Sequence, residues 1–144
     1  MKKVIVYTDG ACLGNPGPGG YAAVLLYGSH RKEISGGTPQ TTNNRMEVMA
    51  AIIALETLKF VCEVAVYSDS RYLVDAVEKG WLVRWKANGW RRNKRGPTLN
   101  VDLWERLLPL LAQHKVKFHW VKSHAGHAEN ERCDMLAKAA IARL

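Results

Sequence analysis

The sequence has no apolar run near the roughly 18–20 residues that a membrane-spanning helix requires. Its N-terminus is basic and then apolar, but Asp9 interrupts the apolar run too early for a secretory signal peptide. We therefore expect a cytoplasmic protein that makes no contact with a membrane.

Cysteine is also scarce. Cys12, Cys62 and Cys133 are odd in number and show no CxxC spacing, which argues against a disulfide framework and against a zinc site. Reduced thiols are the expectation. Cys12 is close enough to Asp9 in the chain to line a site there, although a purely structural role for this thiol stays open.

Acidic residues are missing between Glu78 and Asp102, in a chain whose net charge is +8. Such a stretch is usually a solvated face. Here tryptophans are interleaved with the cations, and a groove that binds nucleic acid uses both cations and flat rings. We therefore predict nucleic-acid contact by this segment, which contains Lys79, Trp81, Arg84, Trp85, Lys86, Trp90, Arg91, Arg92, Lys94 and Arg95.

The chain has no internal repeat, linker or low-complexity segment, and 144 residues suit one domain. Residues 14–20 are dense in Gly and Pro and predict a turn. Short connections predict an antiparallel meander for the first three strands, and the helical crossover before the fourth permits parallel pairing. The result is a single α/β domain with a mixed sheet flanked by helices. The predicted strands are 3–9, 21–27, 32–36, 63–69 and 116–121, and the predicted helices are 46–59, 70–80, 101–112 and 129–144.

Two predicted strands carry the same pattern, since residues 4–9 (VIVYTD) and 64–69 (VAVYSD) each end in a carboxylate. If these strands lie side by side and parallel, Asp9 and Asp69 are at equal depth, about 4.8 Å apart. Open α/β sheets place their ligands at this edge. Two carboxylates so close repel each other unless a cation or proton intervenes, and hard oxygen ligands select magnesium or manganese.

Glu47 adds a third carboxylate. On the predicted helix it shares a face with Ala51, Ala54 and Leu58, so it lies in line with small and apolar groups. A simpler alternative remains, because Asp before Gly or Ser at a strand end is common turn chemistry. The matched pair and Glu47 together favour a metal site.

The C-terminal region supplies two further candidates. Asp134 shares a helical face with Ala137 and Ile141, although an isolated Asp at such a position more often forms a surface salt bridge. His124 lies in a short loop between the last strand and the last helix. A loop histidine is a reasonable proton carrier near neutral pH.

Several long motifs, in the same order and spacing, closely resemble bacterial type I ribonuclease H over essentially the whole chain. The resemblance implies the ribonuclease H-like fold, with a five-stranded mixed sheet of three antiparallel and then two parallel strands. It implies one catalytic domain over residues 1–144, with a basic, Trp-rich protrusion near 81–96. The motifs are residues 7–10 (YTDG), 14–21 (GNPGPGGY), 42–47 (TNNRME), 68–70 (SDS), 124–127 (HAGH) and 130–134 (NERCD).

The activity that the resemblance implies is endonucleolytic hydrolysis of the RNA strand in RNA–DNA hybrids, leaving 5′-phosphate and 3′-hydroxyl ends. Asp9, Glu47, Asp69 and Asp134 match the family's four metal-binding carboxylates. They would hold two magnesium ions when substrate is bound, with manganese as a substitute. His124 matches a loop histidine that assists proton transfer or product release.

The resemblance also implies substrate contacts. RNA differs from DNA by its 2′-hydroxyls, which the wide minor groove of an A-like hybrid displays. The family positions that contact this groove correspond to Cys12, Asn15, Asn43 and Asn44. The family positions that form a pocket for a DNA-strand phosphate correspond to Thr42 and Asn100. Trp81 resembles the aromatic residue of the DNA channel, and residues 85–95, with Trp85, Trp90, Arg91 and Arg92, correspond to the basic protrusion. A monomer is the simplest expectation.

Two residues depart from the family pattern. Ser123 stands where the family usually has Gly, and Arg71 replaces a commoner polar amide beside Asp69. Two other functions remain as alternatives: a hybrid-binding module that has lost catalysis, and another phosphoryl-transfer enzyme of the same fold, such as a resolvase or integrase relative. The first alternative conflicts with four intact acidic positions. The second would not be expected to retain Asn43 and Asn44 together with the basic, Trp-rich segment.

Overall fold

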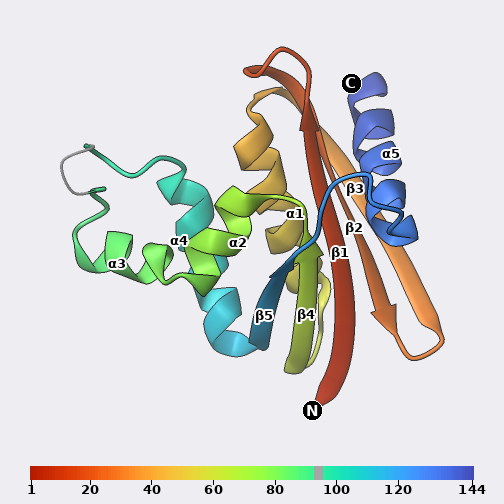
Figure 1. Cartoon of the computed structure of the whole chain (residues 1–144), viewed down its shortest axis with the longest axis horizontal. Coiled ribbons are helices and arrows are strands. Elements are labelled where there is room, and N and C mark those ends of the chain that lie inside the picture. Colours follow the sequence, from red (N-terminus) through yellow and green to blue (C-terminus); the bar gives the residue numbers. More distant parts are fainter. Residues whose placement is uncertain (93–95) are drawn as a thin grey trace.

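A computed structural model describes residues 1–92 and 96–144, and a five-stranded sheet in the order β3-β2-β1-β4-β5 forms its centre (Figure 1). The strands are β1 (Lys2–Cys12), β2 (Gly17–Tyr27), β3 (His30–Thr41), β4 (Cys62–Ser68) and β5 (Lys115–Trp120). The first three pair antiparallel, whereas β4 is parallel to β1 and β5 is parallel to β4. The predicted mixed sheet is therefore confirmed.

The register between β1 and β4 is the one that the repeated pattern predicts. Tyr7 pairs with Tyr67 and Thr8 with Ser68, so Asp9 and Asp69 both follow the last parallel pair. The prediction that β1 ends at Asp9 is wrong, however. β1 runs on to Cys12 because its other edge stays paired with β2.

The glycine-rich segment after β1 is only partly a turn. Residues 17–20, predicted to belong to the turn, form the start of β2 instead. Close packing explains the composition, because a Cβ atom on Gly20 would lie only 2.1 Å from the carbonyl oxygen of Ala137. Glycine at this position lets the last helix approach the backbone of the strand.

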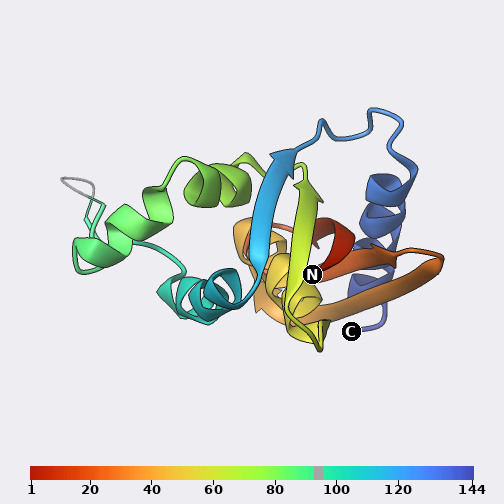
Figure 2. The same ribbon diagram turned by 90° about the horizontal axis from the view of Figure 1, so that it is seen from below.

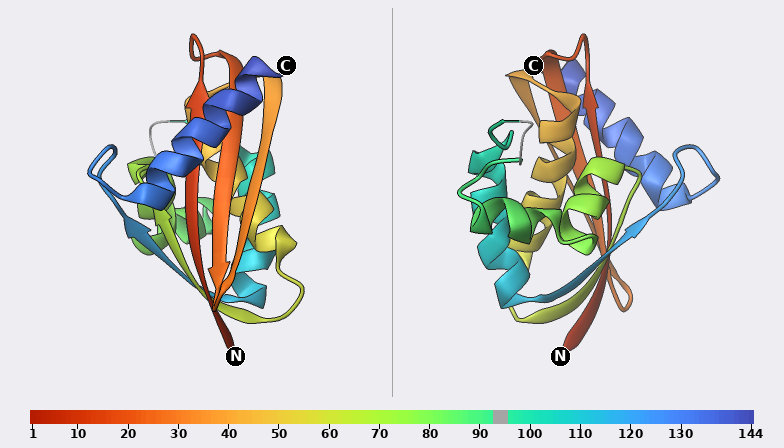
Figure 3. Two further views of the ribbon diagram at one scale, coloured as in Figure 1. Left: turned by 90° about the vertical axis from the view of Figure 1, so that its right-hand side faces the viewer. Right: turned by 60° about the vertical axis from the view of Figure 1, so that its left-hand side comes forward.

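Helices cover both faces of the sheet. α5 (Ala128–Ala142) packs on β1, β2 and β3, and α1 (Asn43–Thr57) packs on β1 and β2 from the other face (Figure 3). α1 in turn contacts α2 (Arg71–Glu78) and α4 (Val101–Gln113). None of these helices, nor any other in the described part of the chain, is long and apolar enough to cross a membrane.

A helix that the sequence did not predict, α3 (Trp81–Ala87), lies within the basic segment. It projects from the body of the molecule beside α2 and α4 (Figures 1 and 2). Trp81 packs at a centroid distance of 6.2 Å from Trp85, which lies 6.0 Å from the fully buried Trp104. Trp90 also packs against the core, and its indole N–H donates to Glu105 Oε1 at 2.9 Å.

These contacts show that the tryptophans of the basic segment pack against the protein itself. The sequence pattern favours a ligand on which the three indoles pack, whereas all three are partly buried against the protein's own core. The basic side chains therefore remain the main reason to expect nucleic acid at this segment. Of these, Lys94 and Arg95 lie outside the described residues.

Candidate active site

Three carboxylates converge where the parallel pairing of β1 and β4 ends. Asp9 lies in β1, Asp69 directly follows β4, and Glu47 lies in the first turns of α1. Each offers one oxygen, and these three atoms all lie within 4.8 Å of one another. The structure thus brings together the pair that the repeated strand pattern singled out and the helical residue added to it.

A glycine allows Glu47 to reach this place. A Cβ atom on Gly10 would lie 2.5 Å from the backbone nitrogen of Glu47 and 2.6 Å from the carbonyl carbon of Met46. Only a residue without a side chain lets α1 rest directly on the backbone of β1. The Asp9-Gly10 pair therefore serves both the chemistry and the helix packing.

Burial makes this cluster costly to ionise. Asp9 and Glu47 are each only 5% exposed. Burial, followed by the charge of Asp69, raises the pKa of Asp9 to about 7. Burial, followed by the charges of Asp9 and Asp69, raises the pKa of Glu47 well above its usual value.

The donor set fits a hard divalent cation. Within the described chain, no hydrogen-bond donor reaches the buried Oε1 of Glu47. The backbone N–H of Gly10 donates to Oδ1 of Asp9 at 2.9 Å. Three oxygen donors without histidine or cysteine favour magnesium or manganese over zinc.

Asp134 and His124 line the same open cleft, whose volume is about 480 Å³. Asp134 lies outside the tight cluster, and its Oδ2 pairs with Lys138 Nζ at 3.0 Å, i to i+4 along α5. His124 lies in the loop between β5 and α5 in the left-handed region, with φ 54°. Both predicted residues therefore line the cleft, and the pairing with Lys138 involves only Oδ2 of Asp134.

The asparagines predicted to contact substrate border this cleft. Asn43 and Asn44 line it beside the carboxylates. Asn15 lies nearby, since its Oδ1 accepts from the backbone N–H of Asn43 at 2.9 Å. The Sγ of Cys12 is 3.5 Å from the carbonyl oxygen of Thr41. Asn43 and Asn44 therefore line the cleft, whereas Asn15 and Cys12 contact the chain at residues 41–43, at and just before the start of α1.

Thr42 and Asn100, 58 positions apart in the chain, each form a hydrogen bond with Arg45, one with its backbone and the other with its guanidinium. The Oγ1 of Thr42 accepts from the backbone N–H of Arg45 at 3.2 Å and so caps α1. Arg45 Nη1 donates to Oδ1 of Asn100 at 3.3 Å, and Asn100 donates to the hydroxyl of Tyr72 at 3.0 Å. The sequence did not indicate that Arg45 and Tyr72 hold this group.

The residues of the basic segment lie apart from the carboxylates. Among the described residues that line the cleft there is none from α3 or from the chain directly after it. Arg92 Nε donates to the carbonyl oxygen of Pro97 at 3.1 Å, and Arg91 is exposed. Trp81, Trp85 and Trp90 are half-buried against the core. The structure therefore makes this segment a separate surface.

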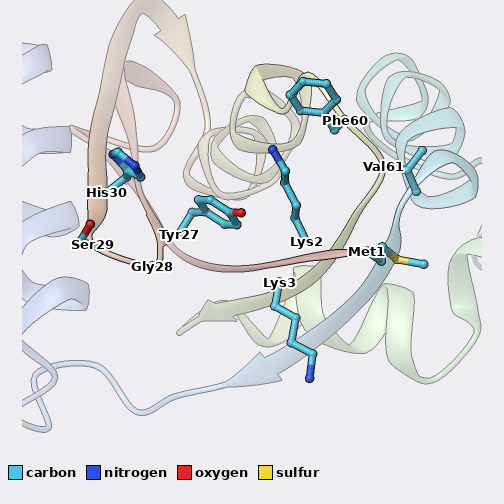
Figure 4. Close-up of a pocket in the computed structure, with 9 residues that line it drawn as sticks. All are labelled: Met1, Lys2, Lys3, Tyr27, Gly28, Ser29, His30, Phe60 and Val61. Atoms are coloured by element: carbon cyan, nitrogen blue, oxygen red, sulfur yellow. The ribbon is translucent and has the colours of Figure 1, made fainter.

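A larger hollow, of about 860 Å³, lies beside the N-terminal end of β1 (Figure 4). Lys2 lines it, and its Nζ lies 4.3 Å from the ring centroid of Phe60 and 5.4 Å from that of Tyr27. No carboxylate is among the described residues that line it. The described carboxylates that converge all line the smaller cleft.

The RNase H family matches residues 1–142. The chain belongs to this family. It is 66% identical to the Ribonuclease H of Syntrophus aciditrophicus over 143 residues, which cover 99% of this chain and 83% of that protein. It is 64% identical to the Ribonuclease H of Desulforamulus reducens, over 97% of this chain and 88% of that protein.

Solved structures of RNase H proteins share the fold. LC9-RNase H1, described as a type 1 RNase H with the type 2 active-site motif, superposes with a TM-score of 0.88 at 34% identity, over 99% of this chain and 74% of that one. LC11-RNase H1, solved in complex with an RNA/DNA hybrid, gives a TM-score of 0.73 at 25% identity over 97% of each chain. Membership in the RNase H family, expected from the motifs, is thus confirmed.

Proposed function

We propose that this RNase H family protein is an endonuclease that hydrolyses the RNA strand of RNA–DNA hybrids. The observation that carries this proposal is the buried cluster of Asp9, Glu47 and Asp69 in a cleft bordered by Asn43 and Asn44. Relatives that carry the name Ribonuclease H, and one solved with an RNA/DNA hybrid, support it. The products would carry 5′-phosphate and 3′-hydroxyl ends.

The four acidic residues Asp9, Glu47, Asp69 and Asp134 would hold two magnesium ions in the presence of substrate, and manganese would substitute. When bound, such ions polarise the scissile phosphate and make a water molecule more acidic. The protein contributes fixed oxygen ligands, of which Glu47 has a buried oxygen with no donor in the described chain. Asp134, which lines the cleft and pairs with Lys138 through Oδ2 alone, would complete the set through its other oxygen.

The neighbouring side chains would bind and orient the hybrid. Asn43 and Asn44 line the cleft, and Asn15 accepts from the backbone of Asn43. Together with Cys12 these residues would contact the minor groove, since an amide can both donate to and accept from a 2′-hydroxyl. His124, on its loop beside the cleft, would carry a proton to or from the reacting groups or help product release. Nothing in this arrangement reads base sequence, because shape and sugar provide the selection.

Outside the cleft, Thr42 and Asn100 would form the phosphate pocket for the DNA strand. Trp81 would line the DNA channel. The basic protrusion near 81–96, with Trp85, Trp90, Arg91 and Arg92, would bind the hybrid beyond the active site. We propose one catalytic domain over residues 1–144, acting as a monomer in the cytoplasm.

A cleavage assay tests the activity. An RNA–DNA hybrid, end-labelled on RNA, is incubated with magnesium and either the wild type or the Asp9→Asn variant, which keeps the size of the side chain and loses its charge. Cleavage of RNA by the wild type alone supports the proposal. Binding without cleavage by both proteins would favour the binding module, and cutting of duplex DNA would favour another phosphoryl-transfer enzyme.

A further inference from the structure

The loop that follows β5 is attached to the metal-binding end of β4 by three hydrogen bonds. The backbone N–H of Val121 donates to the carbonyl oxygen of Ser68 at 2.9 Å. The indole N–H of Trp120 donates to the carbonyl oxygen of Asp69 at 3.1 Å. Finally, the hydroxyl of Ser123 donates to Oδ2 of Asp69. Two of these bonds hold the backbone, and only the third reaches the carboxylate.

Ser123 is an exposed loop residue, and an exposed hydroxyl can be satisfied by water alone. Here it instead bonds a carboxylate 54 positions earlier in the chain, one of the three that converge. A hydroxyl that donates to one oxygen limits the rotation of the carboxylate plane and leaves lone pairs for a cation. Such partners of metal ligands fix the orientation of the ligand.

The same bond bears on His124, the next residue. A non-glycine residue in the left-handed region, such as His124 at φ 54°, stays there only when its surroundings fix it. Gly126, two residues later, also has a positive φ, of 84°. The Ser123 bond is therefore the last side-chain anchor before a short stretch of unusual backbone that carries the proposed proton carrier.

We propose that Ser123 is a positioning residue that orients the carboxylate of Asp69 for cation binding and couples the loop of His124 to the occupied site. This proposal rests on the function proposed above. It assigns a role to a hydroxyl that glycine or alanine at this position would not supply. The coupling depends on the single hydrogen bond between Ser123 and Asp69, so removing the Ser123 hydroxyl should abolish it.

The rest of the loop attachment does not depend on this hydroxyl. Trp120 keeps its bond to Asp69, and the guanidinium of Arg71 lies 3.8 Å from the centroid of the Trp120 ring. Arg71 is also among the residues that line the cleft. Ser123→Ala therefore removes the bond to the carboxylate while the loop stays attached.

Magnesium binding by the substrate-free protein, measured by calorimetry, tests the first half of the proposal. We expect Ser123→Ala to weaken binding about ten-fold, the lower end of the effect of losing a partner of a metal ligand. Ser123→Thr, which keeps a hydroxyl, should restore most of the affinity. Ser29→Ala, an exposed serine in the turn between β2 and β3, is the matched control and should bind as the wild type does. Equal affinity in Ser123→Ala and Ser29→Ala would overturn the assignment.

Amide chemical shifts test the coupling. In the wild type, magnesium should shift the amides of Gly10 and of residues 124–126. In Ser123→Ala, the shift at Gly10 should persist at saturating magnesium while those of the loop shrink. Loop shifts that stay as large as in the wild type would refute the coupling. Both measurements omit the hybrid and so do not depend on cleavage. A wild type that failed to cleave RNA would count against the proposed function, whereas the magnesium titrations and chemical shifts would still decide the role of Ser123.

Discussion

At the scale of single residues, the carboxylate cluster shows how burial sets the chemistry. The pKa of Asp9, raised to about 7, means that the folded protein binds this proton more tightly than the unfolded chain does. The stabilisation that results is fully present below the ordinary pKa of 3.8 and is lost as the pH rises through about 7. The metal-free site therefore destabilises the fold under the mildly alkaline conditions in which a cation would bind.

Removing the ionisable group at position 9 should therefore stabilise the metal-free protein at high pH. Asp9→Asn cannot ionise, so without metal at pH 8 its free energy of unfolding should exceed that of the wild type by about 1–3 kcal/mol. The gain should shrink toward pH 4, where the wild-type carboxyl is protonated in the folded state and close to its ordinary pKa of 3.8 in the unfolded chain. Urea denaturation at both pH values, with a chelator present, measures it. A variant that is no more stable than the wild type at pH 8 would show that ionisation of Asp9 carries no such cost.

At the scale of elements, the close contact between α1 and β1 positions Glu47. Gly10→Ala would place a methyl group 2.5 Å from the backbone of Glu47, so α1 must shift. We expect a loss of stability of about 1–3 kcal/mol from overpacking, together with weaker magnesium binding because Glu47 moves. Thermal unfolding and metal titration measure the two effects.

Gly28→Asn is the control for this substitution. Gly28 has φ 56° in a turn, a Cβ atom there meets nothing within 4 Å, and Asn tolerates the left-handed region. This variant should keep its magnesium affinity. If Gly10→Ala bound magnesium as tightly as the Gly28→Asn control, the helix contact would not be what places Glu47.

The basic segment gives a prediction that separates charge from packing. Arg91 and Arg92 replaced by Ala should weaken hybrid binding and flatten its dependence on salt, by about one unit of slope for each phosphate that is no longer neutralised. Trp85→Ala should instead lower stability by about 3 kcal/mol, because Trp85 packs on the buried Trp104. Hybrid binding measured over a range of salt concentrations, together with thermal melts, distinguishes the two. Unchanged affinity and slope in the arginine variant would remove this segment from the substrate-binding surface.

At the scale of the whole molecule, a cation at the proposed metal site would also stabilise the fold. A cation that binds only the folded state stabilises it by mass action, so the Tm should rise with magnesium concentration and fall when a chelator is added. Binding releases protons from carboxyls with a raised pKa, so the rise in Tm should be larger at pH 8 than at pH 6. Calorimetric melts at the two pH values measure it. Asp9→Asn should show little or no rise, and a magnesium-dependent Tm equal to that of the wild type would place the cation elsewhere.

The residues of the site could be found from the sequence to different degrees. Asp9 and Asp69 were predictable because a repeated strand pattern fixes their relative depth once the strands pair in parallel. Asp134 and His124 needed the resemblance to a known family, since an isolated Asp on a helix or His in a loop has many uses. The partnership of Ser123 with Asp69 had no signal in the sequence, because a hydrogen bond across 54 positions depends on how two loops meet.

The sequence by itself determined the class of fold, the antiparallel meander, the parallel pairing of the first and fourth strands, the pair of Asp9 and Asp69, and the positive charge. Hydrophobic periodicity, turn residues and repeated patterns are local, so the sequence contains them. The tertiary structure alone decided what each side chain touches. It packed the tryptophans near α3 partly against the core, made a strand of residues 17–20, and bonded Ser123 to Asp69. The reason is physical: burial and contacts between distant segments follow from packing of the whole chain, and no window of sequence contains them.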